Sequence, residues 1–310
     1  MLRRARILGT FLLTFASLAG WGEWSWVFGG ALIHAQLHFT LAWLLILIGG
    51  LAQRARGNAA WAFAFLIGHS WVYSSPFLHA PASLDGPVGE TLRVAWFNAW
   101  GKPSAVDAAH AYALDQELDL IALGQAGGVP AIRRLMQDFP HHAYDHEDRI
   151  GLFSRVPIVE TRWYSGPEGH QPPVRKWLCA RLENGADVWV GHVQTPNESA
   201  HLAGLATLQE AMQLRTAEVG IAPTFLMADL NATPWSADLG LLHEQGWQSA
   251  SAGTWPVRTW RDPSQPWLRW PIDYVLVRQG VGVQHFEVGP ALGSDHFLIH
   301  AVLQLPKAPR

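Results

Sequence analysis

Two polar side chains follow directly on one of the most apolar segments of the sequence. The run Phe225–Ala228 has the length and composition of a buried strand, and Asp229 and Asn231 come immediately after it. A buried strand that ends in this way delivers a carboxylate and a carboxamide to the edge of a sheet, where chemistry can take place. A simple Asx turn explains the same pattern, because Asp and Asn favour such turns. The choice between the two interpretations depends on residues elsewhere in the chain.

Further polar side chains stand at the ends of other predicted strands. They are Asn98, Gln125, His192, Asp273, Asp295 and His296. Carboxylates, carboxamides and two histidines that converge on one edge suit phosphoryl transfer, in which positioned charge and a divalent cation do most of the work. The sequence therefore predicts a phosphoryl-transfer site built from strand ends.

The elements that must position these residues lie beyond residue 90. Apolar, β-rich runs are interleaved with helical stretches, but several strands near the end follow one another without a helix between them. The expected strands are 92–97, 119–123, 150–153, 188–193, 225–229, 272–277, 282–288 and 297–304, and the expected helices are 105–117, 132–139, 198–218 and 236–245. This order favours a mixed, layered α/β sandwich over a doubly wound sheet.

Residues 1–90 have a different composition. They contain only five basic and three acidic residues, and three apolar stretches lie at roughly 7–27, 31–51 and 59–78. Each is near the ~20 residues that a membrane helix needs. Buried core helices can look similar, but three in series with so little charge are unusual in a soluble domain. We therefore expect a membrane anchor of about three transmembrane helices over residues 1–80, a Pro/Gly/Ser-rich linker at 81–90, and one domain over 91–310.

The arginines of this region predict its orientation. Arg3, Arg4 and Arg6 precede the first apolar stretch, and Arg54 and Arg56 follow the second. Positively charged residues near membrane ends prefer the cytoplasm, so the C-terminal domain is expected outside it. The expected location is the bacterial inner membrane with a periplasmic C-terminal domain, and a cleavable signal peptide would leave that domain on the same side. The first 80 residues are too short and too poor in intramembrane charge for a transporter or channel.

A set of short segments beyond residue 90 carries a resemblance to a known family. The segments are Arg93–Asn98, Asp119–Gln125, Gly151–Ile158, Val190–His192, Ala228–Pro234, Thr254–Pro256, Ile272–Tyr274 and Ser294–His296. In this order they resemble the motifs of the endonuclease/exonuclease/phosphatase superfamily. Each motif alone is weak, and it is their agreement in order across residues 91–305 that makes the resemblance strong.

The resemblance implies a four-layer α/β sandwich, in which two packed mixed β-sheets are flanked by helices. It also implies hydrolysis of phosphate esters with Mg²⁺ or Mn²⁺, the metal being bound by Asn98, Gln125 and Asp295.

The resemblance further implies a role for each remaining site residue. His296, oriented by Asp273, would act as a general base or as a phosphate ligand. Asp229 would position or activate the attacking water, and Asn231 would hold a phosphate oxygen. His192 would stabilise charge on the phosphate or on the leaving group.

One residue departs from the family's pattern. The second motif normally ends in Glu, the principal carboxylate ligand of the metal, and this chain has Gln125 there. Mg²⁺ prefers charged carboxylates, so weaker metal binding is expected. The acids Asp145, Glu147 and Asp148 are candidates to compensate. The alternative is a catalytically silent member that serves as a binding or scaffold module.

The loop at 254–270 interleaves Trp255, Trp260, Trp267 and Trp270 with Pro and Arg. Such a loop can stack on nucleobases, lie at lipid headgroups or simply pack. Of the chain's 22 basic and 25 acidic residues, 17 and 22 lie beyond residue 90, which gives that part a formal charge of −5. A nucleic-acid-binding face usually leaves a basic imprint, so nucleic acid is not the favoured partner. A phosphate ester, including a lipid-linked one beside the membrane, is the expected substrate.

Overall fold

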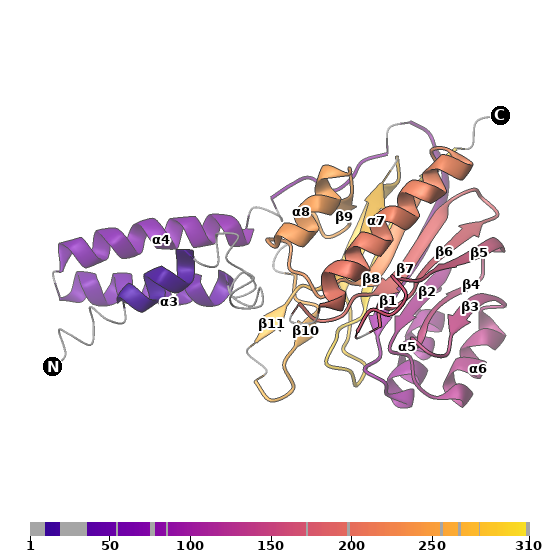
Figure 1. The fold of residues 1–310 in the computed structure, drawn as a ribbon, viewed down its shortest axis with the longest axis horizontal. Helices are drawn as coiled ribbons and strands as arrows, with labels where there is room; N and C mark the ends of the chain where they lie inside the picture. Colours follow the sequence, from indigo (N-terminus) through magenta and orange to yellow (C-terminus); the bar gives the residue numbers. More distant parts are fainter. Residues whose placement is uncertain are drawn as a thin grey trace. The chain divides into compact units, whose positions relative to one another are not determined.

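The computed structural model describes residues 10–18, 36–53, 55–74, 78–84, 86–171, 173–196, 199–254, 257–265, 268–278 and 280–307. The chain divides into two compact units (Figure 1). One comprises Met1–His79 with Pro234–Ala237, and the other comprises Ala80–Thr233 with Asp238–Arg310.

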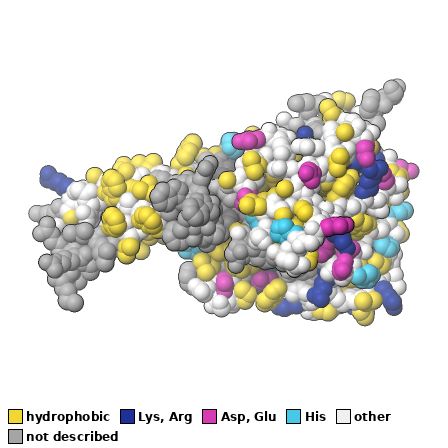
Figure 2. Space-filling view, in the orientation of Figure 1, with side chains coloured by type: hydrophobic (Ala, Val, Ile, Leu, Met, Phe, Trp, Pro, Cys, Tyr) yellow, Lys and Arg dark blue, Asp and Glu magenta, His cyan; other side chains and the backbone are white. Residues whose placement is uncertain are grey.

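The N-terminal unit is helical. Its main elements are α3 (Gln36–Ala52) and α4 (Arg56–Ser74), and residues 10–18 form a further helical segment. Trp43 of α3 is fully buried and stacks on Phe65 of α4, with 4.7 Å between the ring centroids. Hydrophobic side chains also cover much of the outer surface of α3 and α4 (Figure 2), including Leu45, which is 69% exposed.

The predicted membrane spans are not borne out where the structure describes them. In the part of the chain that the structure describes, no helix is both long enough and apolar enough to cross a membrane. The described part of the stretch at 31–51 lies in α3 and most of the stretch at 59–78 lies in α4, whose 19 residues include polar ones such as Asn58 and His69. The predicted span at 7–27 lies largely outside the described residues.

The second unit contains two six-stranded mixed sheets (Figure 1). The first has the strand order β13-β14-β1-β2-β4-β3. Its strands are β1 (Val88–Asn98), β2 (Leu120–Gly124), β3 (His141–Asp145), β4 (Ile150–Ser154), β13 (Gly282–Val288) and β14 (Ile299–Pro306). The pair β1–β2 is parallel and the other pairs are antiparallel. We call this sheet A.

The second sheet, sheet B, has the order β5-β6-β7-β8-β12-β9. Its strands are β5 (Ile158–Tyr164), β6 (Trp177–Leu182), β7 (Asp187–His192), β8 (Thr224–Asp229), β9 (Gln248–Ser249) and β12 (Asp273–Arg278). Here β7–β8 is the parallel pair. A two-stranded hairpin of β10 (Trp260–Arg261) and β11 (Arg269–Trp270) completes the unit.

Helices cover one face of each sheet. α5 (Pro103–Asp115) and α6 (Val129–Asp138) share a core cluster with alternate residues of sheet A, such as Ala95 and Phe97. α7 (Ala200–Val219) and α8 (Ala237–Glu244) share another with alternate residues of sheet B, such as Leu226 and Ala228. Side chains alternate along a strand, so the intervening buried residues face the other sheet. The expected sandwich of two packed mixed sheets flanked by helices is confirmed.

Several elements differ from the sequence-based expectation. β1 begins at Val88, inside the predicted linker, because its exposed start pairs with the end of β14. β3, β5 and β6 were not expected. β3 begins with two histidines, and β5 alternates half-buried with exposed residues, so neither has the apolar run of a central strand.

Candidate active site

Three site residues form one row across neighbouring strands of sheet B. His192 ends β7 and pairs in register with Asp229, which ends β8. Asp229 in turn pairs with Asp273, which begins β12. Directly opposed residues on adjacent strands project from the same face of a sheet. The three apolar strands therefore deliver one histidine and two carboxylates, all buried, to a single point.

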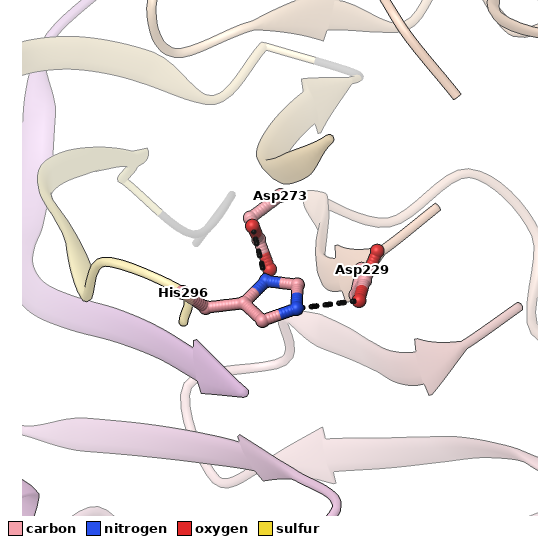
Figure 3. Close-up of side chains that lie close together, drawn as sticks. All are labelled: Asp229, Asp273 and His296. Atoms are coloured by element: carbon pink, nitrogen blue, oxygen red, sulfur yellow. Dashed lines mark hydrogen bonds and ion pairs between the residues drawn. The ribbon is translucent and has the colours of Figure 1, made fainter. Parts of the chain in front are cut away.

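A second histidine joins this row from the segment that precedes β14. The His296 ring lies between two carboxylates (Figure 3): its Nδ1 is 2.8 Å from Asp273 Oδ2, and its Nε2 is 3.7 Å from Asp229 Oδ2. Ser294 fixes this segment, since its hydroxyl donates to the Asn98 carbonyl at 2.8 Å and accepts the His296 N–H at 3.1 Å. His296 is thereby held with each ring nitrogen facing a carboxylate.

Sheet A contributes side chains from the end of β1. Asn98 donates its amide N–H to Asp229 Oδ2 at 2.9 Å, and Trp96 donates its indole N–H to Asp273 Oδ1 at 2.8 Å. Trp96 and Asn98 are two residues apart on one strand, so they project from the same face. Both sheets thus build the site.

Asn231 takes part in an Asx turn and also belongs to the site, so both interpretations of the Asp-x-Asn sequence apply. Its backbone N–H donates to Asp229 Oδ1 at 2.9 Å, which is an Asx turn, and its φ of 48° lies in the left-handed region that Asn tolerates. Its side-chain amide donates to the Val193 carbonyl at 2.9 Å and lies 3.3 Å from His192 Nε2. The turn therefore also places a carboxamide beside this row of site residues.

The two histidines have opposite electrostatic environments. Burial alone would lower the pKa of His296, but the carboxylates of Asp273 and Asp229 outweigh burial and raise it to about 9. For His192, burial and then the positive charges of Arg175 and His296 hold the pKa well below its usual value. His296 is thus an imidazolium at neutral pH and His192 is a neutral imidazole.

Asp229 has an unusual acidity as well. Burial, followed by the negative charge of Asp273, raises its pKa to about 7, although His296 and two hydrogen-bond donors act in the opposite direction. A carboxylate with a pKa near neutrality can take up and release a proton under physiological conditions. His192 Nε2 lies 3.3 Å from Asp229 Oδ2, so both histidines contact the same carboxylate.

Comparison with known families identifies this arrangement. A family model described as the endonuclease/exonuclease/phosphatase family matches residues 93–296, which include β1 from Arg93 onward and every residue of the row just described. The chain belongs to the endonuclease/exonuclease/phosphatase family.

Solved structures of this family share the fold. A family member from Bacteroides vulgatus aligns with a TM-score of 0.58 and 17% identity, covering 70% of this chain and 99% of that one. A mannosyl-6-phosphatase from Bacteroides thetaiotaomicron gives 0.55 and 15%, with 68% and 99% covered. TDP2 from D. rerio, complexed with a single-strand DNA product, gives 0.56 and 15%, with 69% and 99% covered. No curated protein matches the chain. At these identities the likeness concerns the fold alone.

Members of the endonuclease/exonuclease/phosphatase family are usually dependent on a divalent metal, and the described residues include one cluster with suitable spacing. Ligand atoms of Asp229, Asp273 and His296 lie within 4.8 Å of one another. Within this cluster Asp273 is already bound through both oxygens, by Trp96 and His296. The two Asp229 oxygens likewise accept hydrogen bonds, from the Asn231 backbone N–H and the Asn98 amide, so a cation here would share ligands that are already hydrogen-bonded.

The metal ligands expected from the sequence do not form a complete Mg²⁺ site. Asp295 Oδ2 accepts the Trp260 indole N–H at 2.9 Å, and Asn98 Oδ1 accepts the Trp100 N–H at 3.0 Å. Gln125 follows β2 with φ of 45°, and its side chain makes no hydrogen bond to any described residue. A neutral carboxamide and two engaged oxygens do not fit an ion that prefers free carboxylates.

The acids proposed to compensate for Gln125 are engaged elsewhere. Lys176 Nζ binds Asp145 at 2.8 Å and Glu147 at 2.9 Å, while the Lys176 backbone N–H binds Asp148 at 2.7 Å. These contacts hold the β3–β4 turn to the start of β6. The three acids therefore do not replace the missing carboxylate.

Sequence reasoning missed residues that support the site from behind. Trp96 binds Asp273, Trp260 binds Asp295, and the Thr259 hydroxyl oxygen accepts the backbone N–H of Asp273 at 2.9 Å. One signal was available, because Trp96 is two residues before Asn98 and so had to share its face. The strands and hairpin that bring the others close are far apart in sequence.

Proposed function

We propose that the chain hydrolyses a phosphate ester by attack of water on phosphorus. The observation that carries the proposal is the position of Asp229, whose carboxylate contacts His192, His296 and Asn98 within a buried site. A base with a pKa near 7 beside a histidine that is protonated at neutral pH suits this reaction.

In the proposed mechanism Asp229 takes a proton from the attacking water. As the new P–O bond forms and the bond to the leaving group breaks, His296 donates its Nε2 proton to the leaving oxygen. Asp229 then returns a proton to His296 across the 3.7 Å that separates them. Asp273 keeps the Nδ1 proton in place and stabilises the imidazolium. No step passes through a metal, because the expected ligand set is incomplete.

This assignment replaces the general-base role expected for His296 with that of an acid and keeps its expected contact with phosphate oxygens. Its raised pKa makes it an acid and a ligand for phosphate oxygens at neutral pH, and a poor general base. The neutral His192 donates Nε2–H to Asp229 or to a phosphate oxygen, and Asn231 binds a phosphate oxygen through its amide.

We propose a phosphoester other than nucleic acid as the substrate. The formal charge of −5 beyond residue 90 disfavours a polyanion. Trp260 and Trp270 of the hairpin stack on each other at 5.1 Å, which leaves them less available to nucleobases. A phosphatase of sugars and a DNA-bound TDP2 both have this fold, so the fold does not choose between the substrate classes.

A catalytically silent scaffold is the second candidate. Gln125 favours it, because the carboxylate that the family uses for metal binding is missing. The ordered array of His192, Asp229, Asp273 and His296 favours the enzyme, since a binding module gains nothing from two carboxylates buried beside each other.

Hydrolysis of bis(p-nitrophenyl) phosphate by the full chain tests the proposal. It is measured with and without Mg²⁺ or Mn²⁺, for the native protein and for His296→Ala. His285→Ala serves as the matched control, because His285 is exposed on β13. Turnover lost only in His296→Ala supports the enzyme. Turnover that appears only after Gln125→Glu supports the silent alternative.

A further inference from the structure

The indole of Trp96 makes an unusual contact behind the active site. It is fully buried in β1 of sheet A, and its N–H donates to Asp273 Oδ1 at 2.8 Å on β12 of sheet B. The Asp273 side chain has no exposed surface. A hydrogen bond to a buried carboxylate is among the stronger polar interactions in a protein.

Every polar atom around Asp273 is used to fix it. Oδ1 accepts the Trp96 indole N–H and Oδ2 faces His296 Nδ1 at 2.8 Å. The Asp273 and Ile272 backbone N–H groups both donate to the Thr259 hydroxyl oxygen, at 2.9 and 3.0 Å. The Trp96 and His296 contacts, one on each oxygen, set the rotation of the carboxylate about its Cβ–Cγ bond.

The neighbouring strand makes room for this indole. Gly124, the last residue of β2, lies under the ring. A Cβ at that position would be 2.7 Å from Cη2 and 2.8 Å from Cζ2 of Trp96. Since real Cβ atoms do not approach so closely, position 124 has to be glycine while Trp96 keeps this rotamer. The strand end before Gln125 is therefore shaped by Trp96.

We propose that Trp96 is a positioning residue for the Asp273–His296 pair. Its indole N–H holds the carboxylate in the plane in which Oδ2 receives the His296 Nδ1 proton. This fixes the imidazole tautomer and directs Nε2 at the reacting phosphate. The proposal rests on the proposed phosphoester hydrolysis.

The test replaces one N–H and little else. Benzothienylalanine, an isostere of tryptophan with sulfur in place of the indole N–H, is introduced at position 96 by nonsense suppression. Trp177 is the matched control: it is also buried, donates its indole N–H to the Gly204 carbonyl at 2.9 Å, and lies over a strand glycine, Gly191. Trp177 faces α7 on the far side of sheet B and touches no site residue through its N–H.

We expect kcat at position 96 to fall roughly ten- to a hundredfold while KM changes less than about twofold, because supporting partners of a catalytic histidine have effects of this size. The same replacement at position 177 should change kcat less than about twofold. Equal losses at both positions, or retained kcat at position 96, would overturn the proposal.

An NMR measurement that does not depend on turnover tests the role of Trp96 separately from the proposed hydrolysis. The His296 Nδ1 proton should give a strongly deshielded ¹H resonance, protected from exchange by Asp273. Benzothienylalanine at position 96 should shift this resonance upfield and speed its exchange, and the analogue at position 177 should leave it unchanged. If the native protein does not hydrolyse any phosphoester, the resonance still decides whether Trp96 positions the pair. An unchanged resonance at position 96 would contradict it.

Discussion

At the scale of single residues, the acidities of Asp229 and His296 determine when the site can work. Asp229 has to be ionised to accept a proton, and its pKa is raised to about 7. His296 has to be protonated to donate one, and its pKa is raised to about 9. Activity should therefore rise as pH passes about 7 and decline as pH passes about 9.

This bell-shaped dependence is checked by kcat/KM measured across that range. Asp229→Asn should abolish the rise together with most of the activity. A profile that is already flat at its maximum near pH 5 would contradict the role of Asp229 as the base.

The identity of residue 125 should determine how tightly the site binds a divalent metal. Gln125→Glu adds a negative charge at the end of β2 and should tighten Mn²⁺ binding about tenfold or more, which corresponds to ~1.4 kcal/mol. Titration calorimetry with Mn²⁺ measures this effect. Gln137→Glu, which makes the same charge change at an exposed position of α6, is the control and should leave binding unchanged.

How much of the site the sequence predicts depends on where each residue lies. His192, Asp229 and Asp273 are predictable because each stands at one end of an apolar strand, and these strand ends gather at a sheet edge. The hydrogen bond from Trp96 to Asp273 is not predictable, because it joins positions 177 residues apart in different sheets. The engagement of Asp295 by Trp260 likewise depends on a hairpin whose placement no local pattern encodes.

At the scale of elements, the β3–β4 turn carries an acid-sensitive connection to β6. Asp145 Oδ1 accepts the backbone N–H groups of Glu147 and Asp148, at 2.9 and 2.8 Å, and Oδ2 binds Lys176. Burial would raise the pKa of Asp145, but Lys176 and the two N–H donors outweigh burial and lower it. The stabilisation is therefore complete above the unfolded-state pKa and is lost as pH falls through the lower folded-state value.

Asp145→Asn should consequently lower the free energy of unfolding by about 1.5–3 kcal/mol at pH 7, the usual contribution of hydrogen bonds to a charged group. The difference between native and variant should shrink below about pH 4. Urea titration at both pH values measures it. Glu147→Gln, at a side chain that is 83% exposed, should have a much smaller effect, and an equal effect would contradict this account.

The burial of each strand determines whether it can be predicted from the sequence. The central strands β1, β2, β7, β8 and β12 are buried on both faces and read as apolar runs. The edge strands β3 and β5 are half-exposed and carry His, Glu and Arg. They therefore lack the apolar run from which a strand is predicted. Sheet order and the pairing of distant strands follow from packing, which a single sequence does not encode locally.

At the scale of the whole molecule, the N-terminal unit is distinguished by the hydrophobic side chains that it exposes. α3 and α4 expose large hydrophobic side chains, among them Leu45, Leu51 and Trp71, each more than 60% exposed. Exposed apolar patches of this kind mark an interaction surface. Membrane association through residues 1–79 stays a prediction.

Expression of the full chain and of residues 80–310, followed by fractionation, tests this prediction. The full chain should sediment with membranes and be released by detergent, whereas residues 80–310 should not sediment. The shorter chain should also keep its hydrolytic activity, because every described site residue lies in the second unit. Sedimentation of both chains would contradict an anchoring role for residues 1–79.

The strand order of sheet A has a consequence for synthesis on the ribosome. β1, the first strand of the second unit, pairs with β14, so that Trp96 lies opposite Ile299. A nascent chain that has emerged as far as β8 already carries Asn98, His192 and Asp229, but β1 still lacks a neighbour on one side. His296, the partner of Asp229 in proton transfer, and Asp273, which orients His296, are synthesised only afterwards. Hydrolytic competence is therefore expected to appear late in translation, when β14 closes the sheet.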